Sequence, residues 1–188
     1  EWINYSQKYL EFKITDTGIY RINFTTLSQG LTGIGESISN IDPHKIQIFG
    51  RGEEQYIYIE GESDSSFDSN DFIEFYATKN DGWLDARIYE SSNDQSNPFY
   101  SLFNDTATYY LTISGSNNGK RMGLVSPPVS PFPQGFDYFF KEEIISFHDV
   151  YYQGEFSSGA ASPIYKAGKG WFSGNIYNSS PKQVSINA

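Results

Sequence analysis

Residues 9–23, YLEFKITDTGIYRIN, hold the pattern that decides the fold class. Within them, residues 10–14 alternate between apolar and polar side chains, which is the two-residue period of a strand with one buried face. Thr15–Gly18 supply turn chemistry, and Ile19–Asn23 resume the alternation. We therefore predict that the two runs form a β-hairpin, whose edges need partners from elsewhere in the chain.

Five further runs predict short strands, because each is rich in β-branched or aromatic residues and is bounded by Gly, Pro, Asn or Asp. One short helix is expected over Thr25–Gln29, with a threonine hydroxyl at its start and Gly30 at its end. We predict a mainly all-β fold, a β-sandwich or jelly-roll-like arrangement of antiparallel sheets with one or two short helices. The predicted strands are Ile46–Phe49, Tyr56–Glu60, Phe72–Tyr76, Ala86–Tyr89 and Tyr109–Ile113.

A proline-rich stretch, Ser126–Pro133, divides the chain. Four of these eight residues are prolines, which cannot pair within a central strand and are common in crossovers. We expect a β-sandwich-like domain over residues 1–125. Residues 126–188 are expected to form a proline-rich crossover and a smaller β extension that leads to a following domain.

The second region has a weaker pattern. Phe136–Phe147 fits helical spacing, but its aromatic content favours a long strand, and we predict the strand. We expect loops or short hairpins over Tyr151–Ser180, fastened by Trp171 and Phe172. Gln183–Ala188 resemble the start of another strand, so we expect the chain to be part of a longer polypeptide.

Charge and composition exclude several classes of function. The chain has 13 basic and 23 acidic residues, a net charge of −10, which repels phosphates and anionic lipids, so we expect no nucleic-acid partner. No apolar run approaches the ~20 residues of a membrane-spanning helix, so we expect no membrane insertion. The absence of cysteine excludes disulfides, thiolate zinc sites and cysteine nucleophiles within these residues.

No catalytic motif is recognisable in the sequence. His44 and His148 lie far apart, outside any zinc-binding spacing, and we interpret both as polar loop or strand-end residues. The glycines at residues 50–52 lack the lysine of a phosphate-binding loop, and there is no Gly-x-Ser-x-Gly elbow. A glycosidase pair among the carboxylates of Glu53–Asp85 stays open, because only their separation in space decides it. We predict that this chain has no catalytic or cofactor-binding residues and is not itself an enzyme.

An acidic stretch over residues 64–71 is a candidate calcium site, because hard oxygens crowded on a loop can coordinate this ion. The candidate ligands are Asp64, Asp68, Asn70 and Asp71. Their spacing does not match an EF-hand loop, which requires a turn glycine and a bidentate glutamate. We favour the alternative, an Asx-rich turn that enters the predicted strand Phe72–Tyr76.

Trp83 is a candidate carbohydrate-binding residue, because an indole face can stack on a flat apolar surface such as a sugar ring. The alternative is a tryptophan that covers the open end of a β-sandwich. One sequence does not separate the two, and we favour the packing role.

The order of several short segments, which span nearly the whole chain, carries a resemblance to a known family. The segments are Tyr9–Ile14, Gly18–Ile22, Asp42-Pro43 with Ile46–Gly50, Phe67-Asp68 with Asp71–Tyr76, Asn97-Pro98, Tyr109–Thr112 and Gly170-Trp171-Phe172. In this order they resemble the region that precedes the catalytic domain in gingipain-type cysteine peptidases, including the sortase-like peptidase of the type IX secretion system.

The resemblance implies a non-catalytic accessory domain, because the catalytic cysteine and histidine of that family lie in a separate domain further along the polypeptide. It also implies a location in the periplasm, at the outer-membrane surface or outside the cell, in a bacterium with an outer membrane. The implied partners are downstream domains of the same polypeptide, and secretion-system proteins or a protein substrate. The alternative is a carbohydrate-binding module of a surface protein.

Overall fold

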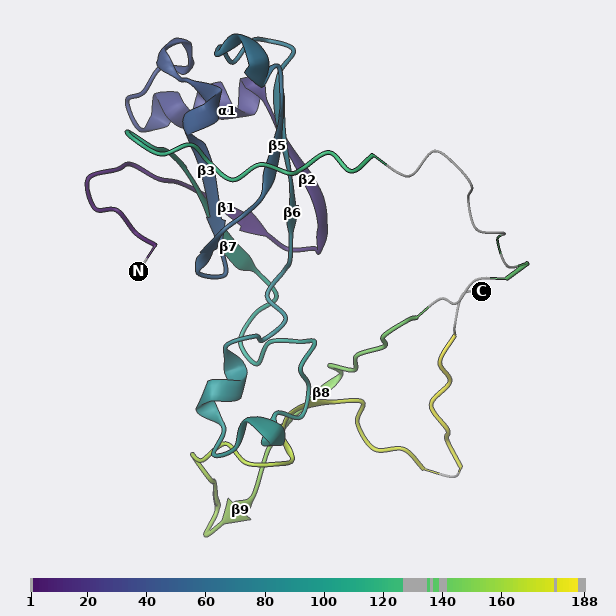
Figure 1. The fold of residues 1–188 in the computed structure, drawn as a ribbon. Coiled ribbons are helices and arrows are strands. Elements are labelled where there is room, and N and C mark those ends of the chain that lie inside the picture. Colours follow the sequence, from purple (N-terminus) through teal and green to yellow (C-terminus); the bar gives the residue numbers. More distant parts are fainter. Residues whose placement is uncertain (1, 127–134, 136, 139–141, 178, 186–188) are drawn as a thin grey trace. The chain divides into compact units, whose positions relative to one another are not determined.

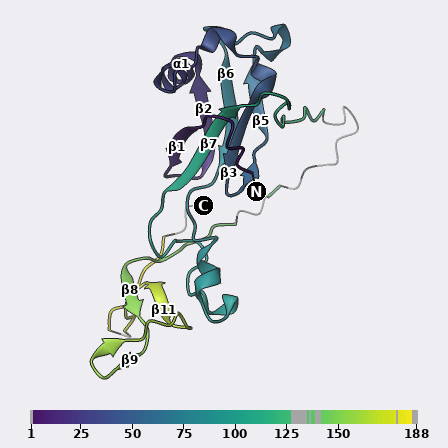
Figure 2. The same ribbon diagram turned by 90° about the vertical axis from the view of Figure 1, so that its left-hand side faces the viewer.

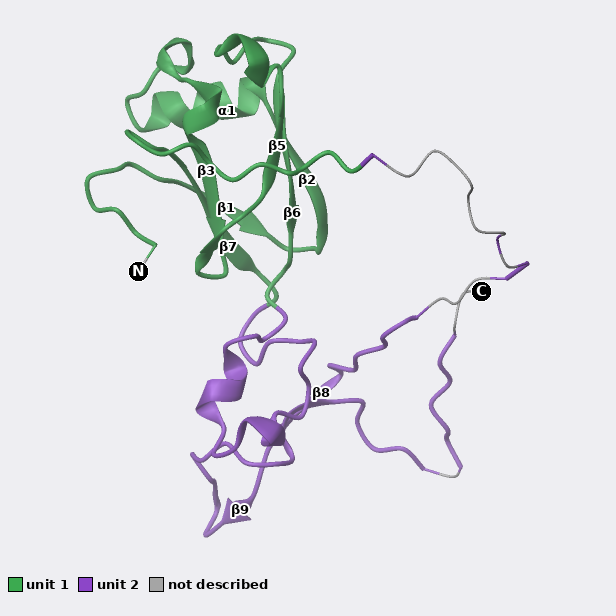
Figure 3. Cartoon of the chain, in the orientation of Figure 1, with its two compact units in different colours: residues 1–80, 105–125 green, residues 81–104, 126–188 purple. Residues whose placement is uncertain are grey.

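The structure is a computed structural model of the 188-residue chain, and it describes residues 2–126, 135, 137–138, 142–177 and 179–185. The chain divides into two compact units (Figure 3). Unit 1 comprises residues 1–80 and 105–125, and unit 2 comprises residues 81–104 and 126–188. The sequence analysis grouped residues 81–104 with the first region, whereas they belong to unit 2. The chain leaves unit 1 at Asn80 and returns at Asp105, where the Asn80 amide donates a hydrogen bond to the Asp105 carbonyl at 3.1 Å.

Two antiparallel sheets form unit 1, and the predicted mainly β fold is confirmed (Figures 1 and 2). The first sheet has the order β1 (Leu10–Ile14), β7 (Ala107–Ile113), β3 (Ile46–Gly50) and β4 (Glu53–Glu54). The second has the order β2 (Gly18–Asn23), β6 (Phe72–Ala77) and β5 (Ile57–Glu60). Helix α1 (Phe24–Gly33) follows β2, and short 3-10 turns span Ile38–Asn40, Pro43–Lys45 and Glu62–Asp64.

The hairpin predicted for residues 9–23 is wrong. Strand β1 pairs with β7, and β2 pairs with β6, so the turn between them carries the chain from one sheet to the other. The rings of Phe12 on β1 and Tyr20 on β2 both pack on Phe75, at centroid distances of 5.6 and 6.1 Å. The apolar sides of the two runs therefore face one core from opposite sheets. Alternation predicts a buried face, but it does not identify the strand's partner.

The core of unit 1 lies between the two sheets and beneath helix α1. Phe12 and Tyr109 of the first sheet contact Phe75 of the second, and Leu27 and Leu31 of the helix are buried against the same cluster. The helix is longer than the predicted Thr25–Gln29 turn, because it continues through Gly30 to Gly33. Its N-cap is Asn23 and not a threonine, and the Asn23 side chain accepts a hydrogen bond from the Thr26 amide at 2.9 Å.

Unit 2 is built from short two-stranded pairs and turns. Strand β8 (Val150–Gln153) pairs with β11 (Lys169–Phe172), and β9 (Phe156–Ser157) pairs with β10 (Ala160–Ala161). Unit 2 also contains two short 3-10 turns, η4 (Asp85–Ile88) and η5 (Ser92–Asp94). The expected short hairpins over Tyr151–Ser180 are therefore present, and the Trp171 ring packs against the Tyr100 and Tyr151 rings.

The strand predicted over Ala86–Tyr89 is wrong, since these residues lie in and just after η4. Asp85 explains the difference. Its amide donates to the Gly82 carbonyl at 2.8 Å, and its buried carboxylate accepts hydrogen bonds from the Leu102 amide at 2.7 Å and the Ser101 hydroxyl at 3.2 Å. These contacts close the backbone into a tight turn that local alternation does not reveal.

Three other predictions fall wholly or partly outside the described residues. Most of the proline-rich stretch Ser126–Pro133 lies outside them. Within the predicted strand Phe136–Phe147, residues 136 and 139–141 lie outside, and the described residues 142–147 form no strand. Within Gln183–Ala188, the described residues 183–185 form no strand either. No helix among the described residues is long and apolar enough to cross a membrane.

Candidate functional site

The outward side of the three-stranded sheet carries large apolar and aromatic side chains where the alternation predicts polar ones. Ile19 on β2, Tyr58 on β5 and Tyr76 on β6 have exposed fractions of 75%, 42% and 54%. Tyr58 and Tyr76 alternate with buried residues, and Ile19 alternates with half-buried ones, as a sheet with one solvent-facing side requires. We call this side the aromatic face. It comprises Ile19, Arg21, Tyr58, Glu60, Phe72, Glu74 and Tyr76.

The register of the strands sets neighbours on the aromatic face. Ile19 lies directly opposite Tyr76, and Glu74 lies between Arg21 on one side and Tyr58 on the other. Directly opposed side chains in an antiparallel sheet lie close enough to contact each other. The apolar pair Ile19 and Tyr76 on β2 and β6 therefore lies next to a polar row, Arg21, Glu74 and Tyr58, that crosses all three strands.

Arg21 is held in place on this face by two contacts. Its Nη2 and Nε atoms donate to one carboxylate oxygen of Glu74 at 2.7 and 2.9 Å, and its guanidinium carbon lies 3.9 Å from the centre of the Phe72 ring. A guanidinium that both pairs with a carboxylate and stacks on a ring has fewer rotamers to lose when a partner binds. Arg21 therefore presents a fixed set of donors beside the exposed rings.

Tyr58 is similarly fixed. Its hydroxyl donates a hydrogen bond to the Glu60 carboxylate, and the Tyr58 and Phe72 ring centres are 6.2 Å apart. The hydrogen bond to Glu60 raises the pKa of the Tyr58 hydroxyl, because loss of its proton would set two negative charges side by side. Tyr58 and Arg21 are therefore held at defined positions on the aromatic face. A partner that binds there would immobilise few additional side-chain rotamers.

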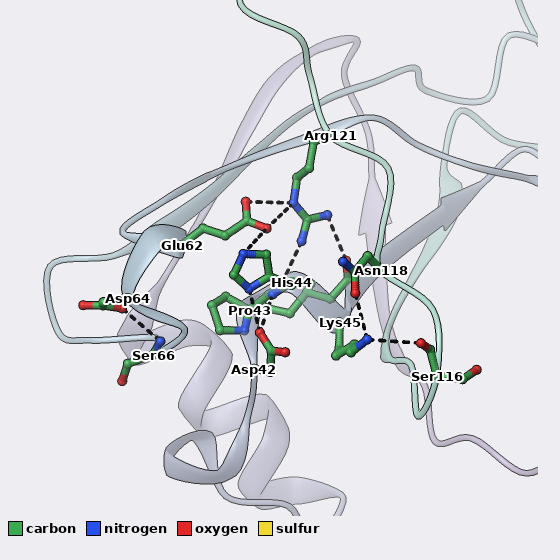
Figure 4. Close-up of polar contacts among 11 residues, drawn as sticks. Asp42, Pro43, His44, Lys45, Glu62, Asp64, Ser66, Ser116, Asn118 and Arg121 are labelled. Atoms are coloured by element: carbon green, nitrogen blue, oxygen red, sulfur yellow. Dashed lines mark hydrogen bonds and ion pairs between the residues drawn. The ribbon is translucent and has the colours of Figure 1, made fainter.

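His44 lies in a separate polar cluster of unit 1, shown in Figure 4. Its Nδ1 is 2.8 Å from Asp42 Oδ1, and its Nε2 is 3.8 Å from Glu62 Oε1. The hydrogen bond with His44 is the largest cause that lowers the pKa of Asp42. Arg121 completes the cluster, because its Nε donates to both Glu62 oxygens at 2.9 Å and its Nη2 donates to the Pro43 carbonyl at 2.8 Å.

This cluster ties together three segments that are distant in sequence, around residues 42–45, 62 and 121. Its charged groups are used in contacts with one another, which is the arrangement of a structural cross-link. The second histidine, His148, lies in unit 2, where its ring stacks on Tyr100 with centroids 4.1 Å apart. His44 belongs to unit 1 and His148 to unit 2, so neither unit contains both histidines.

The four candidate calcium ligands do not converge on one point. The Asp64 carboxylate accepts a hydrogen bond from the Ser66 amide at 2.9 Å, and the Asp71 carboxylate accepts one from the Asp68 amide at 2.6 Å. The Asp64 contact is that of an Asx turn, whereas the Asp71 carboxylate reaches back three residues to cap the loop. Within the part of the chain that the structure describes, no three His, Cys, Asp or Glu side chains form a group that could hold a metal ion.

Trp83 lies in unit 2 just before η4, where its amide donates to the Asp81 carboxylate at 3.0 Å and 39% of the residue is exposed. It is not part of the aromatic face, which the sequence analysis did not identify. The aromatic face could have been predicted, because Tyr58, Phe72 and Tyr76 occupy the outward positions of the predicted strands Tyr56–Glu60 and Phe72–Tyr76.

Comparison of the chain with models of protein families, with curated proteins and with solved structures finds no match. The functional argument consequently rests on the residues and their geometry.

Proposed function

We propose that this chain is a non-catalytic accessory β domain of an exported gingipain-like cysteine peptidase, and that the aromatic face docks against a downstream domain of the same polypeptide. The observation that carries the docking role is the pair of exposed neighbours Ile19 and Tyr76 on an ordered sheet. The peptidase context rests on the ordered segments that resemble the region before the catalytic domain of that family.

The composition of the aromatic face supports a protein partner. Tyrosine, phenylalanine and arginine are enriched in the cores of protein interfaces, and tyrosine and arginine dominate binding hot spots. Tyr76 and Ile19 would form an apolar centre, with the polar side chains of Arg21 and Glu74 beside it. A partner that covers this centre would remove exposed apolar area from water, which is the main driving force for association.

The pairing of charges on this face also favours docking. Arg21 and Glu74 already neutralise each other, so a partner that covers them buries an ion pair and not a lone charge. Burial of an unpaired charge would oppose binding by several kcal/mol, on the order of 3 to 5. The Arg21–Glu74 pair therefore requires no compensating charge from a partner that covers it.

The proposed setting is the periplasm, the outer-membrane surface or the extracellular space of a bacterium with an outer membrane. Secretion-system proteins or a protein substrate are proposed as further partners. The first test is the coding sequence that follows Ala188. We expect it to encode a domain with a catalytic histidine and cysteine, and a stop codon shortly after Ala188 would contradict the peptidase context.

Docking is tested with the domain encoded after Ala188, expressed separately and titrated with the 188-residue chain by isothermal calorimetry. Replacing both Ile19 and Tyr76 with serine is expected to weaken binding by about thirtyfold or more, because each occupies the apolar centre. Tyr5→Ser is the matched control, since Tyr5 is exposed in the same unit but lies outside the aromatic face. Unchanged affinity of the double variant would rule out docking through this face.

A carbohydrate-binding role is the second candidate, and the exposed Tyr76 ring favours it. A tyrosine face can stack on a sugar ring, and the neighbouring Glu74 and Arg21 side chains can hydrogen-bond to hydroxyl groups. In a polysaccharide pull-down, this role predicts retention of the chain that Tyr76→Ala abolishes. Loss of retention with Trp83→Ala alone would instead assign the sugar site to unit 2.

A further inference from the structure

A cavity of about 590 Å³ opens at one end of the sandwich in unit 1. It lies between the N-terminal residues 4–8, the segment 34–41 after helix α1, and residues 111–116 at the end of β7. Ligand pockets in proteins generally measure roughly 300–1,000 Å³, so this end cavity has the size of a binding site. It shares no residue with the aromatic face.

The floor of the end cavity is aliphatic. Leu10, Ile34 and Ile113 line it and are half-buried, so they present the aliphatic surface, and the buried Leu31, Ile41 and Leu111 complete the lining. No aromatic side chain lines this cavity among the described residues. An aliphatic group of a ligand would therefore find a matching surface, whereas a sugar or a nucleobase would find no ring on which to stack.

The rim of the end cavity is polar but carries no net charge. Lys8 and Glu36 are the charged residues that line it, and they neutralise each other at 2.8 Å, while Lys8 Nζ also donates to the Ile34 carbonyl at 2.8 Å. The other polar groups are amides and hydroxyls, such as those of Gln7, Asn40 and Ser116. Side-chain amides both donate and accept hydrogen bonds, as the peptide groups of a ligand do.

We propose that the end cavity binds an uncharged, extended peptide segment, with one aliphatic side chain on the floor and its peptide groups at the amide rim. The neutral rim and the chain's net charge of −10 disfavour phosphates and carboxylates. The missing aromatic ring disfavours saccharides. This site is independent of docking through the aromatic face, so either proposal can fail alone.

The test is a titration of the ¹⁵N-labelled 188-residue chain, followed by amide chemical shifts. The probe is a tripeptide with the sequence Ala-Leu-Ala, blocked at both ends, and the comparison ligands are blocked Ala-Asp-Ala and maltotriose. We expect saturable shifts at cavity residues such as Thr112 and Ser114 with Ala-Leu-Ala. Affinity for Ala-Asp-Ala is expected to be about tenfold lower, because a carboxylate does not suit the aliphatic floor.

Gly115 offers a way to block the cavity. It lines the cavity, and a Cβ at this position would meet no atom within 4 Å, so the first atom of a larger side chain is accommodated there without a clash. Gly115→Phe is expected to weaken binding of Ala-Leu-Ala by about tenfold or more, a change of roughly 1.4 kcal/mol or more. Gly123→Phe is the matched control, since a Cβ there also meets nothing within 4 Å and Gly123 does not line the cavity.

Three results would overturn the proposal: no saturable shifts with Ala-Leu-Ala, equal or stronger binding of maltotriose or Ala-Asp-Ala, or undiminished binding by Gly115→Phe. If Gly115→Phe lowers the melting temperature, Asn40→Ala decides the question. Asn40 is an exposed rim residue, and its removal should weaken binding by about two- to tenfold. Asn70→Ala is its control outside the cavity, and equal effects of these two variants would also reject the site.

Discussion

The ring of Tyr109 lies against the backbone of Gly50, its cross-strand partner on β3. A Cβ atom at position 50 would overlap with the Tyr109 ring. This ring cannot move aside easily, because it is 1% exposed and its hydroxyl bonds to the Thr78 amide at 3.0 Å and the Thr78 carbonyl at 3.2 Å. Close packing, and not an unusual backbone angle, therefore requires glycine at position 50.

Gly50→Ala is expected to lower the free energy of unfolding by about 3 kcal/mol, the upper range for overpacking of a core. Urea denaturation followed by tryptophan fluorescence measures the change. Gly18→Ala is the matched control in β2, because a Cβ at that position would meet no atom within 4 Å. We expect this control to stay within about 1 kcal/mol of the wild type. Similar losses for both variants would refute the packing argument.

Arg121→Lys is expected to lower the free energy of unfolding by about 1–3 kcal/mol, because a lysine cannot bond to Glu62 and to the Pro43 carbonyl with one planar group. Arg21→Lys is the matched comparison, since Arg21 pairs with Glu74 on an exposed surface. Exposed pairs contribute about 0–1 kcal/mol, so its effect should be smaller. Equal effects in thermal or urea denaturation would show that the Arg121 cluster is not a cross-link.

The Asp42 contact with His44 predicts a dependence of stability on pH. Because the hydrogen bond from His44 lowers the pKa of Asp42 below the ordinary value of an aspartate, the folded state binds this proton less readily than the unfolded state. The stabilisation is therefore fully present above the unfolded pKa and is lost as pH falls through the folded pKa. As pH is lowered from about 5 to about 2, the free energy of unfolding of Asp42→Asn should fall less than that of the wild type. Urea denaturation at each pH measures both. Parallel curves for variant and wild type would contradict the prediction.

Asp71 is expected to stabilise its loop without a metal ion. It is 8% exposed, and its carboxylate accepts a hydrogen bond from the Asp68 amide and packs against Gly61. Asp71→Ala should lower the free energy of unfolding by about 1–3 kcal/mol. Calcium or a chelator should leave the melting temperature of the wild type unchanged in a thermal scan. A fall in this temperature with the chelator would support the calcium site instead.

The sequence predicted the positions of six strands in unit 1, β1, β2, β3, β5, β6 and β7, but not their pairing. Alternation records which side of a strand is buried, and β1 and β2 both satisfy it, because Phe12 packs on Phe75 across the core and Tyr20 packs on it within the same sheet. The partner of each strand is fixed by residues far along the chain, such as Leu111 opposite Leu10. A short turn such as Thr15–Gly18 is compatible with both a hairpin and a passage between sheets.

The candidate site was predictable only in part. Tyr58 and Tyr76 stand at outward positions within strands that the sequence predicted, so a search for aromatic residues on the polar side would have found them. The end cavity was not predictable, because it requires residues 4–8, 34–41 and 111–116 to meet in space. The helical turn at Asp85 was missed for the same reason, since its partners Ser101 and Leu102 lie further along the chain.

The backbone contact between Asn80 and Asp105 closes unit 1 at the point where the chain leaves it. Because the exit and the return are hydrogen-bonded neighbours on unit 1, the intervening residues 81–104 occupy the place of an ordinary loop between β6 and β7. The entropy cost of closing such a loop grows only slowly with its length. The pairing of β6 and β7 with their neighbours in unit 1 is therefore largely independent of the length of the segment between them.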